Sequence, residues 1–286
     1  MSKLLSTSTV PLSELGRVLV RAGALGSITL LVYDYFCTLY QEIELVWRSP
    51  FSLASMMFFV NRYLPFFDRI VSVNFNFNAS ISAEQCLFQA QAISWLMFIG
   101  IVISELILTL RTYAVWERKR SILITLIILT VVFLVPAIVF TELAVSSLRF
   151  ISHGGCRMTS ASNIIFLAFC LLTMYETILA ILIAIQACKH LRQTRSRWVT
   201  KLYKDGIMFY VYLLVLSCAN IVSCLLAPAL GPWLQAPQRV VHSVLCTRVL
   251  FLIFQRNFPS TRATMVSEEQ ELPVVTLTEI LELEDM

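Results

Sequence analysis

Charged residues are scarce in this chain: they make up 14% of its 286 residues, whereas hydrophobic residues make up 58%. A soluble domain carries about 25% charged residues. The apolar residues come in long blocks, and the mean hydropathy is +0.77. Together these features predict a protein embedded in a lipid bilayer.

Histidine is also scarce, with three residues in different regions of the chain. No predicted helix carries the paired histidines that a membrane haem needs, and no His-Glu-x-x-His zinc motif occurs. The sequence has no phosphate-binding loop, no Gly-x-Ser-x-Gly elbow, and no lysine in its last predicted helix for a retinal Schiff base. We therefore expect no catalytic residues, no metal and no cofactor.

Seven apolar segments are candidates to cross a bilayer, which takes about 20 residues in a helix. The predicted fold class is therefore an all-α polytopic membrane bundle. The seventh segment is the shortest, so six spanning helices with a re-entrant segment remain an alternative. The expected helices cover residues 22–46, 51–71, 86–116, 122–145, 163–188, 206–226 and 240–254.

Lysine and arginine residues set the expected orientation, because cytosolic loops carry an excess of them. Thirteen of them flank the membrane on one side and seven on the other, although Arg17 and Arg21 oppose the trend at the first helix. The count predicts an extracellular N-terminal segment at 1–21, a transmembrane domain at 22–255 and a cytosolic tail at 256–286. The tail is polar and acidic, and we expect it to be disordered.

Two features of the expected outer face agree with this orientation. Asn78-Ala79-Ser80 is an acceptor for N-glycosylation in the loop between the second and third helices. Cys86 and Cys156 are the two cysteines at that face, where an oxidising compartment favours a disulfide. We predict a bridge between them; two free thiols are the alternative.

Charged side chains within the predicted helices indicate structural or functional sites, because burying charge in a membrane is costly. Asp34 and Arg62 lie at similar depth, about 20 Å from the inner surface, so we predict an ion pair between the first two helices. The same argument predicts a pair between Glu105 and Arg248. With Glu176, these residues either fix helix packing or form a ligand, proton or ion site.

Six basic residues lie in the expected inner loop between the fifth and sixth helices. Such a cluster determines topology and contacts anionic lipid. The alternative is a docking surface for a cytosolic signalling partner. Because the basic residues lie beside membrane segments, we expect lipid rather than nucleic acid as their partner. The six are Lys189, Arg192, Arg195, Arg197, Lys201 and Lys204.

The segments Tyr33-Asp34-Tyr35, Glu42-Ile43-Glu44-Leu45-Val46-Trp47 and Asn61-Arg62-Tyr63-Leu64-Pro65 carry a resemblance to a known family. Over about residues 25–68 the chain resembles a fungal, mainly basidiomycete, family of multi-pass membrane proteins that is defined by an N-terminal domain of unknown function. The resemblance implies a membrane bundle and no particular chemistry.

The overall plan also resembles that of G-protein-coupled receptors, which share seven helices, an outer N-terminus and a basic third inner loop. The chain departs from the large rhodopsin-like class in several places. Arg111 follows Leu110 where that class has an acidic residue, and Ala227-Pro228 lacks the aromatic Trp-x-Pro switch. The last helix has no Asn-Pro-x-x-Tyr. The likeness is one of architecture, which does not assign a function.

Three functions therefore remain open. The leading hypothesis is a receptor-like or sensory protein in the plasma membrane, where an unidentified ligand shifts helix packing. The alternatives are a transporter or channel that uses the buried charges, and a structural scaffold. A cavity that reaches Glu105, Glu176 and Arg248 would favour ligand binding or transport, and a packed interior would favour a scaffold.

Overall fold

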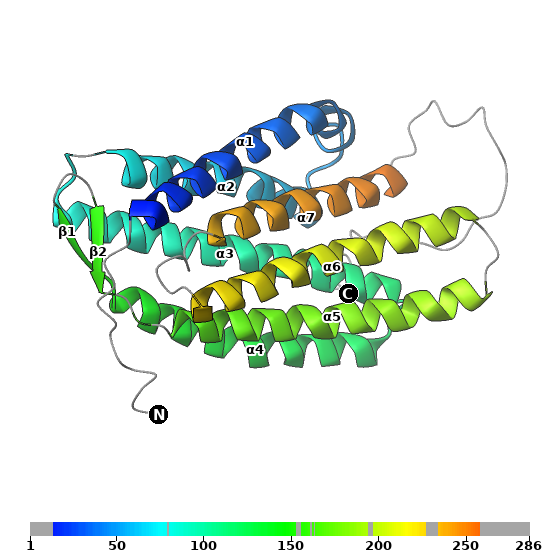
Figure 1. Cartoon of the computed structure of the whole chain (residues 1–286). Helices are drawn as coiled ribbons and strands as arrows, with labels where there is room; N and C mark the ends of the chain where they lie inside the picture. Colours follow the sequence, from blue (N-terminus) through cyan, green and yellow to red (C-terminus); the bar gives the residue numbers. More distant parts are fainter. Residues whose placement is uncertain are drawn as a thin grey trace.

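Seven helices lie side by side in the described part of the computed structural model, which covers residues 14–257 except 79, 153–155, 161, 163, 194–196 and 227–233 (Figure 1). Successive helices run in alternating directions along the bundle. The helices are α1 (Glu14–Leu45), α2 (Leu53–Phe77), α3 (Ala83–Val115), α4 (Arg120–Ser146), α5 (Ile165–Gln193), α6 (Arg197–Leu226) and α7 (Gln235–Asn257).

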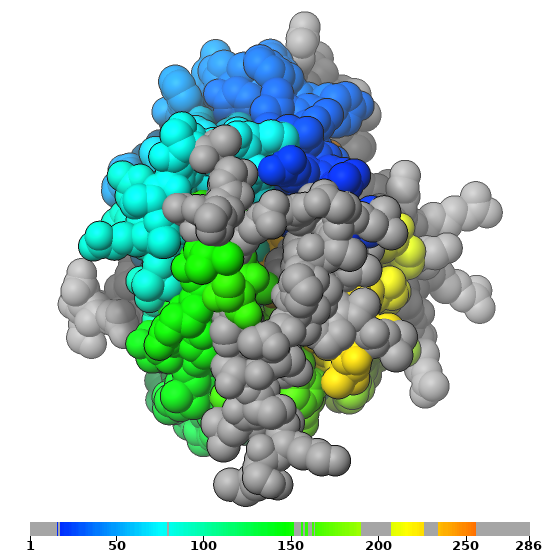
Figure 2. Space-filling model, turned by 60° about the vertical axis from the view of Figure 1, so that its left-hand side comes forward, coloured from blue at the N-terminus to red at the C-terminus, as the bar shows by residue number. Residues whose placement is uncertain are grey.

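A short antiparallel hairpin of β1 (Arg149–Ser152) and β2 (Cys156–Ser160) connects α4 to α5. It lies at one end of the bundle, beside the start of α3, as the green and cyan surfaces of Figure 2 show. We call this the hairpin end. The other end, where α1 meets α2 and α3 meets α4, is the opposite end.

Six of the described helices are long and apolar enough to cross a membrane, and α2 is the exception. The most apolar is α4, of whose central window only 6% is buried inside the bundle. A helix that is apolar all round and so little covered by protein is suited to face lipid. The architecture is that of an integral membrane protein.

The composition of α2 explains why it does not resemble a membrane span. Asn61, Arg62, Asp68 and Arg69 are all 3% exposed or less, and they lie on the helix face that packs inward. The outer face carries exposed apolar residues such as Ile70. The helix is thus amphipathic in the reverse sense of a soluble helix, with its charges inside and its apolar side chains outside.

The centre of the bundle is formed by α3 and α7. Helix α7 packs against α1, α2, α3 and α6, and α3 packs against α2, α4, α5 and α7. In α7, 61% of the most apolar window is buried, the largest share among the six candidate spans. The seventh segment, which is the shortest of the predicted spans, is therefore the most enclosed of the six candidate membrane helices.

Local signals in the sequence account for the starts of α2 and α3. The Ser52 hydroxyl caps α2 by accepting from the amide of Ser55 at 3.3 Å. Ser82 and Gln85 form a capping box at the start of α3. Directly after it, Cys86 forms a disulfide with Cys156 of β2, which confirms the predicted bridge and fixes the hairpin to α3.

Two predicted boundaries are wrong in ways that matter for function. Helix α7 begins at Gln235 rather than 240 and continues to Asn257, so it is a full-length helix of 23 residues. Helix α6 begins at Arg197 rather than 206, so most of the expected inner loop is helical. Of the six basic residues expected in this loop, Lys189 has a described side chain. The described part of the structure does not include Arg195 or the side chains of Arg192, Arg197, Lys201 and Lys204. It also does not include residues 1–13 or the acidic tail from residue 258.

Candidate functional site

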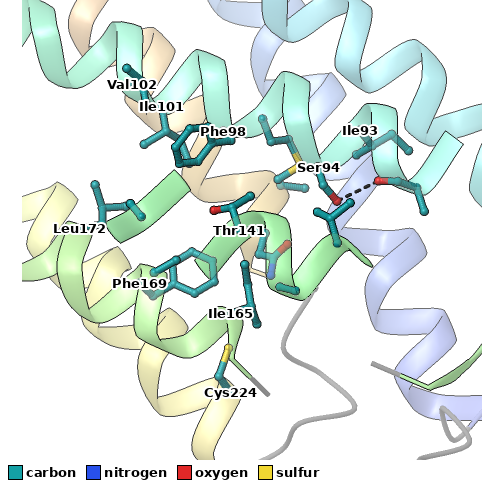
Figure 3. A pocket seen from close by; sticks show the side chains of 18 of the residues that line it. Ile93, Ser94, Phe98, Ile101, Val102, Thr141, Ile165, Phe169, Leu172 and Cys224 are labelled. Atoms are coloured by element: carbon teal, nitrogen blue, oxygen red, sulfur yellow. Dashed lines mark hydrogen bonds between the residues drawn. The ribbon is translucent and has the colours of Figure 1, made fainter. Parts of the chain in front are cut away.

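A cavity of about 370 Å³ lies inside the bundle, mainly between α3, α4 and α5. Figure 3 shows Phe98, Ile101 and Val102 of α3 on one side and Phe169 and Leu172 of α5 on the other. The walls are largely apolar. The volume falls within the range of small-molecule pockets, about 300–1,000 Å³.

The cavity extends from the hairpin end toward the middle of the bundle. Met158 of β2 and Leu148 line it at the hairpin end, and Glu105 and Tyr175 line its inner part. The Tyr175 hydroxyl lies 2.6 Å from the Thr109 hydroxyl, so the tyrosine links α5 to α3 at this depth. A molecule in the cavity would contact both helices.

A cluster of charges, Asp68, Arg69 and Arg239, lies at the hairpin side of the cavity; we call it the arginine cluster. Arg69 Nε donates to Asp68 Oδ1 at 2.5 Å, and Arg239 Nε lies 3.7 Å from Asp68 Oδ2. Arg69 itself lines the cavity, and its Nη2 has no hydrogen-bond partner among the described residues. Two buried guanidinium groups thus share one carboxylate, which leaves one net positive charge beside the cavity.

A second cluster combines Glu105 of α3, Glu176 of α5 and His242 of α7; we call it the acid–histidine cluster. His242 Nε2 lies 3.1 Å from Glu176 Oε1, and His242 Nδ1 lies 3.5 Å from Glu105 Oε1. The exposed fractions of the three residues are 7%, 2% and 0%, in that order. This cluster joins three helices at the inner part of the cavity.

The third cluster lies toward the opposite end, where α1, α2 and α7 meet. Arg248 Nη2 donates to Asp34 Oδ1 at 2.7 Å, and Arg62 Nε lies 2.7 Å from Glu42 Oε2. The Tyr63 hydroxyl donates to Glu42 Oε1 at 2.7 Å. The predicted Asp34–Arg62 pair is at 4.0 Å, so each of these residues has a closer partner than the one predicted for it.

The predicted pair of Glu105 and Arg248 is wrong. Arg248 reaches across to Asp34 on α1, and the α7 side chain that faces Glu105 is His242. Six residues separate His242 from Arg248, which turns the helix by about 240°. Six residues also amount to about 9 Å along the helix axis, so the depth argument misjudged both the height of Arg248 and the face of α7 that it occupies.

Uncharged polar groups also hold α7 against its neighbours. Asn61 Nδ2 donates to the Ser243 carbonyl at 2.9 Å, and the Ser104 hydroxyl donates to Asn61 Oδ1 at 2.8 Å. On α6, Asn220 Nδ2 donates to Gln238 Oε1 at 2.6 Å. These bonds join α2, α3, α6 and α7 through side chains that are all buried.

The main site residues that sequence reasoning missed are Asp68, Arg69, Arg239 and His242. Arg239 was counted on the outer side because the predicted seventh helix began at 240, after it. The available signal was the spacing of Arg239 and His242, three residues apart and so on one helical face. Asp68 similarly lay close to the predicted end of the second helix.

The glycosylation acceptor Asn78 is exposed at the hairpin end, directly after α2. Its Oδ1 accepts from the amide and the hydroxyl of Ser80, at 3.0 Å and 3.1 Å. The structure thus places Asn78 at the same end as the Cys86–Cys156 disulfide. Its glycosylation stays a prediction.

Residues 23–67 match a family model described as "Family of unknown function (DUF6533)". The matched segment contains Asp34, Glu42, Arg62 and Tyr63, so it supplies the α1 and α2 side chains of the third charge cluster. No curated protein matches the chain. Over this segment the chain is similar to a domain of unknown function, within a helical membrane protein of seven described helices.

Proposed function

We propose that this chain is a receptor-like membrane protein that binds a small, mainly apolar ligand in the cavity between α3, α4 and α5. The observation that carries the proposal is the cavity of about 370 Å³ that runs from the hairpin end to Glu105. A ligand site is typically a mainly apolar hollow with a few polar groups. A scaffold has no need of such a hollow.

The hairpin end is proposed to face outward. The glycosylation acceptor Asn78 and the Cys86–Cys156 disulfide both lie there. Lys119 lies directly before α4 and Lys189 lies near the end of α5, so both are toward the opposite end of the bundle. The positive-inside rule predicts such basic residues at a cytosolic face. In this orientation the cavity extends inward from the extracellular side. The proposed location of the protein is the plasma membrane.

The arginine cluster suggests the chemistry of the ligand. Its net positive charge lies beside apolar walls. Arg69 is one of the residues that line the cavity, and its buried Nη2 has no hydrogen-bond partner in the described structure. A carboxylate would pair with this group through a charge-assisted hydrogen bond. The ligand class that fits is therefore an apolar molecule with an acidic head.

Helix α7 offers a route for a signal to the other side. A ligand beside Glu105 contacts the cluster that includes His242 of α7, and α7 continues to Arg248, which binds Asp34 toward the opposite end. A shift of α7 would change both contacts. We also propose that a cytosolic signalling partner binds the basic α5–α6 region. The architectural likeness to G-protein-coupled receptors supports this part of the proposal.

The experiment uses the full chain, purified and placed in lipid nanodiscs. Val102→Trp fills the cavity, and Val131→Trp makes the same change at an exposed position of α4. A panel of long-chain carboxylic acids and their methyl esters is added, and thermal unfolding is followed. An acid should raise the unfolding temperature of the wild type and of Val131→Trp, but not of Val102→Trp. Equal shifts in both variants, or none in any protein, would refute ligand binding in the cavity.

Transport is a second candidate, favoured by the buried ionisable residues Arg239 and His242 on α7 and by the ion pair that Arg248 of the same helix makes with buried Asp34. Proteoliposomes separate the two functions. A transporter moves a radiolabelled acid across the membrane and loses this flux in Glu105→Gln. A receptor binds the same acid without moving it.

A further inference from the structure

Glu105, Glu176 and His242 bring two carboxylates and one imidazole together in the centre of the bundle. One ligand atom from each residue can be chosen so that all lie within 4.8 Å of one another. The three residues come from three different helices, and all are more than nine-tenths buried. Such a convergence of ligand atoms away from water is uncommon unless charge compensates it.

When both carboxylates are ionised, the charges of this cluster do not balance within the described residues. Both carboxylates lack hydrogen-bond donors there, and His242 is the ion-pair partner that the structure gives them. A protonated His242 would neutralise one carboxylate and leave a net negative charge in a low-dielectric interior. A divalent cation bound by a neutral imidazole would neutralise both.

We infer that Glu105, Glu176 and His242 form a binding site for a divalent transition-metal ion, with Zn²⁺ as the best chemical fit. Imidazole nitrogen and carboxylate oxygen are both ordinary zinc ligands. Ca²⁺ and Mg²⁺ favour six or more oxygen ligands, so a site with an imidazole and three protein groups disfavours them.

The geometry requires only small changes to close around an ion. Zinc–ligand bonds of about 2.0–2.2 Å place tetrahedral ligand atoms about 3.4 Å apart. The present separations of up to 4.8 Å therefore contract by at most about 1.4 Å. Rotation about the side-chain bonds of two glutamates can supply a change of this size.

The surrounding structure holds the two glutamates in place. Tyr175 precedes Glu176, and its hydroxyl lies 2.6 Å from that of Thr109 and 3.0 Å from that of Thr130. The Thr109 hydroxyl donates to the carbonyl of Glu105 at 2.7 Å. These contacts link α3, α4 and α5 within about one turn of both carboxylates.

Three protein ligands leave a fourth position, as in zinc sites that keep a water. Glu105 is also one of the residues that line the cavity, so the cluster lies next to it. An ion here would tie α3, α5 and α7 together. The inference does not depend on the proposed ligand, because it follows from the donor set alone.

Cobalt(II) is the probe, because it substitutes for zinc and absorbs visible light. The full chain in nanodiscs is stripped with a chelator, and Co²⁺ is titrated while bound metal is quantified. We expect one ion per chain with a four-coordinate spectrum, displaced by Zn²⁺. Glu176→Gln and His242→Asn should each weaken binding at least 100-fold. Glu142→Gln, on an exposed position of α4, should leave it unchanged.

His242→Cys keeps a zinc ligand and guards against variants that do not fold. Its Co²⁺ complex should acquire the strong near-ultraviolet band of a thiolate-to-cobalt transition. A folded, cobalt-binding His242→Cys without this band would place the ion elsewhere. Failure of the wild type to bind Co²⁺, or unchanged binding in His242→Asn, would leave the cluster as an ion pair only and overturn the inference.

Discussion

The guanidinium of Arg239 on α7 lies directly against Gly100 on α3. A Cβ atom at position 100 would lie 2.2 Å from Nε and Nη2 of Arg239. The arginine is fully buried, so its head group cannot retreat into solvent. The absence of a side chain at Gly100 thus makes room for the second cation of the arginine cluster.

Gly100→Ala should therefore destabilise the bundle by about 1–3 kcal/mol, the usual cost of overpacking a core. The comparison is Gly26→Ala in α1, where nothing lies within 4 Å of the added Cβ. That change should be neutral or stabilise the helix by up to about 1 kcal/mol. Unfolding of both variants in mixed detergent micelles measures the difference, and similar effects at the two glycines would contradict the packing described.

Asp68→Asn should be among the most disruptive single substitutions in α2. It removes the carboxylate that Arg69 and Arg239 share and leaves two buried cations without a counter-charge, at a cost of about 3–5 kcal/mol. Glu142→Gln is the control, because Glu142 is exposed on α4. The readouts are the yield of monodisperse protein and the unfolding midpoint. Equal stability of the two variants would show that Asp68 does not neutralise the arginines.

Arg62 and Arg248 should differ in importance although both contact Asp34. The Arg62 side chain is 4% exposed and also binds Glu42, whereas the Arg248 side chain is 49% exposed. Arg62→Gln should cost about 3–5 kcal/mol, and Arg248→Gln about 1 kcal/mol or less.

A double-mutant cycle tests the partner assignment of Arg62. Adding Glu42→Gln to Arg62→Gln should cost much less than the sum of the two single changes, because the buried pair is already broken. Strict additivity would mean that Arg62 and Glu42 do not interact. The same cycle with Arg248 in place of Arg62 should be close to additive.

Much of the fold could be predicted from the sequence, because helices that contact lipid are made of long runs of apolar residues. The all-α class, the seven helices and the Cys86–Cys156 bridge follow from it. The start of helix α7 was predicted too late, because Arg239 lies near that start and the buried face of the helix is polar. A helix enclosed by protein does not need to be apolar, so hydropathy underestimates it.

The site could be predicted only in part. Counting residues along the first two helices predicted similar depths for Asp34 and Arg62, and the two come within 4.0 Å of each other. The face that a residue occupies depends on how helices pack, which one sequence does not state. Glu105 was assigned to Arg248, but its neighbour is His242, which lies about 9 Å away from Arg248 along α7. The bounds of α7 were inexact, so both the depth and the face of Arg248 were misjudged.

Equilibrium binding of a fluorescent long-chain carboxylic acid tests the central claim most directly. It is measured on wild type, Val102→Trp and Val131→Trp in nanodiscs, with empty nanodiscs subtracted. If the acid occupies the cavity between α3, α4 and α5, Val102→Trp should bind at least tenfold more weakly and Val131→Trp should match the wild type. Saturable binding that is equal in all three proteins, or no binding beyond that of the lipid, would contradict the proposed function.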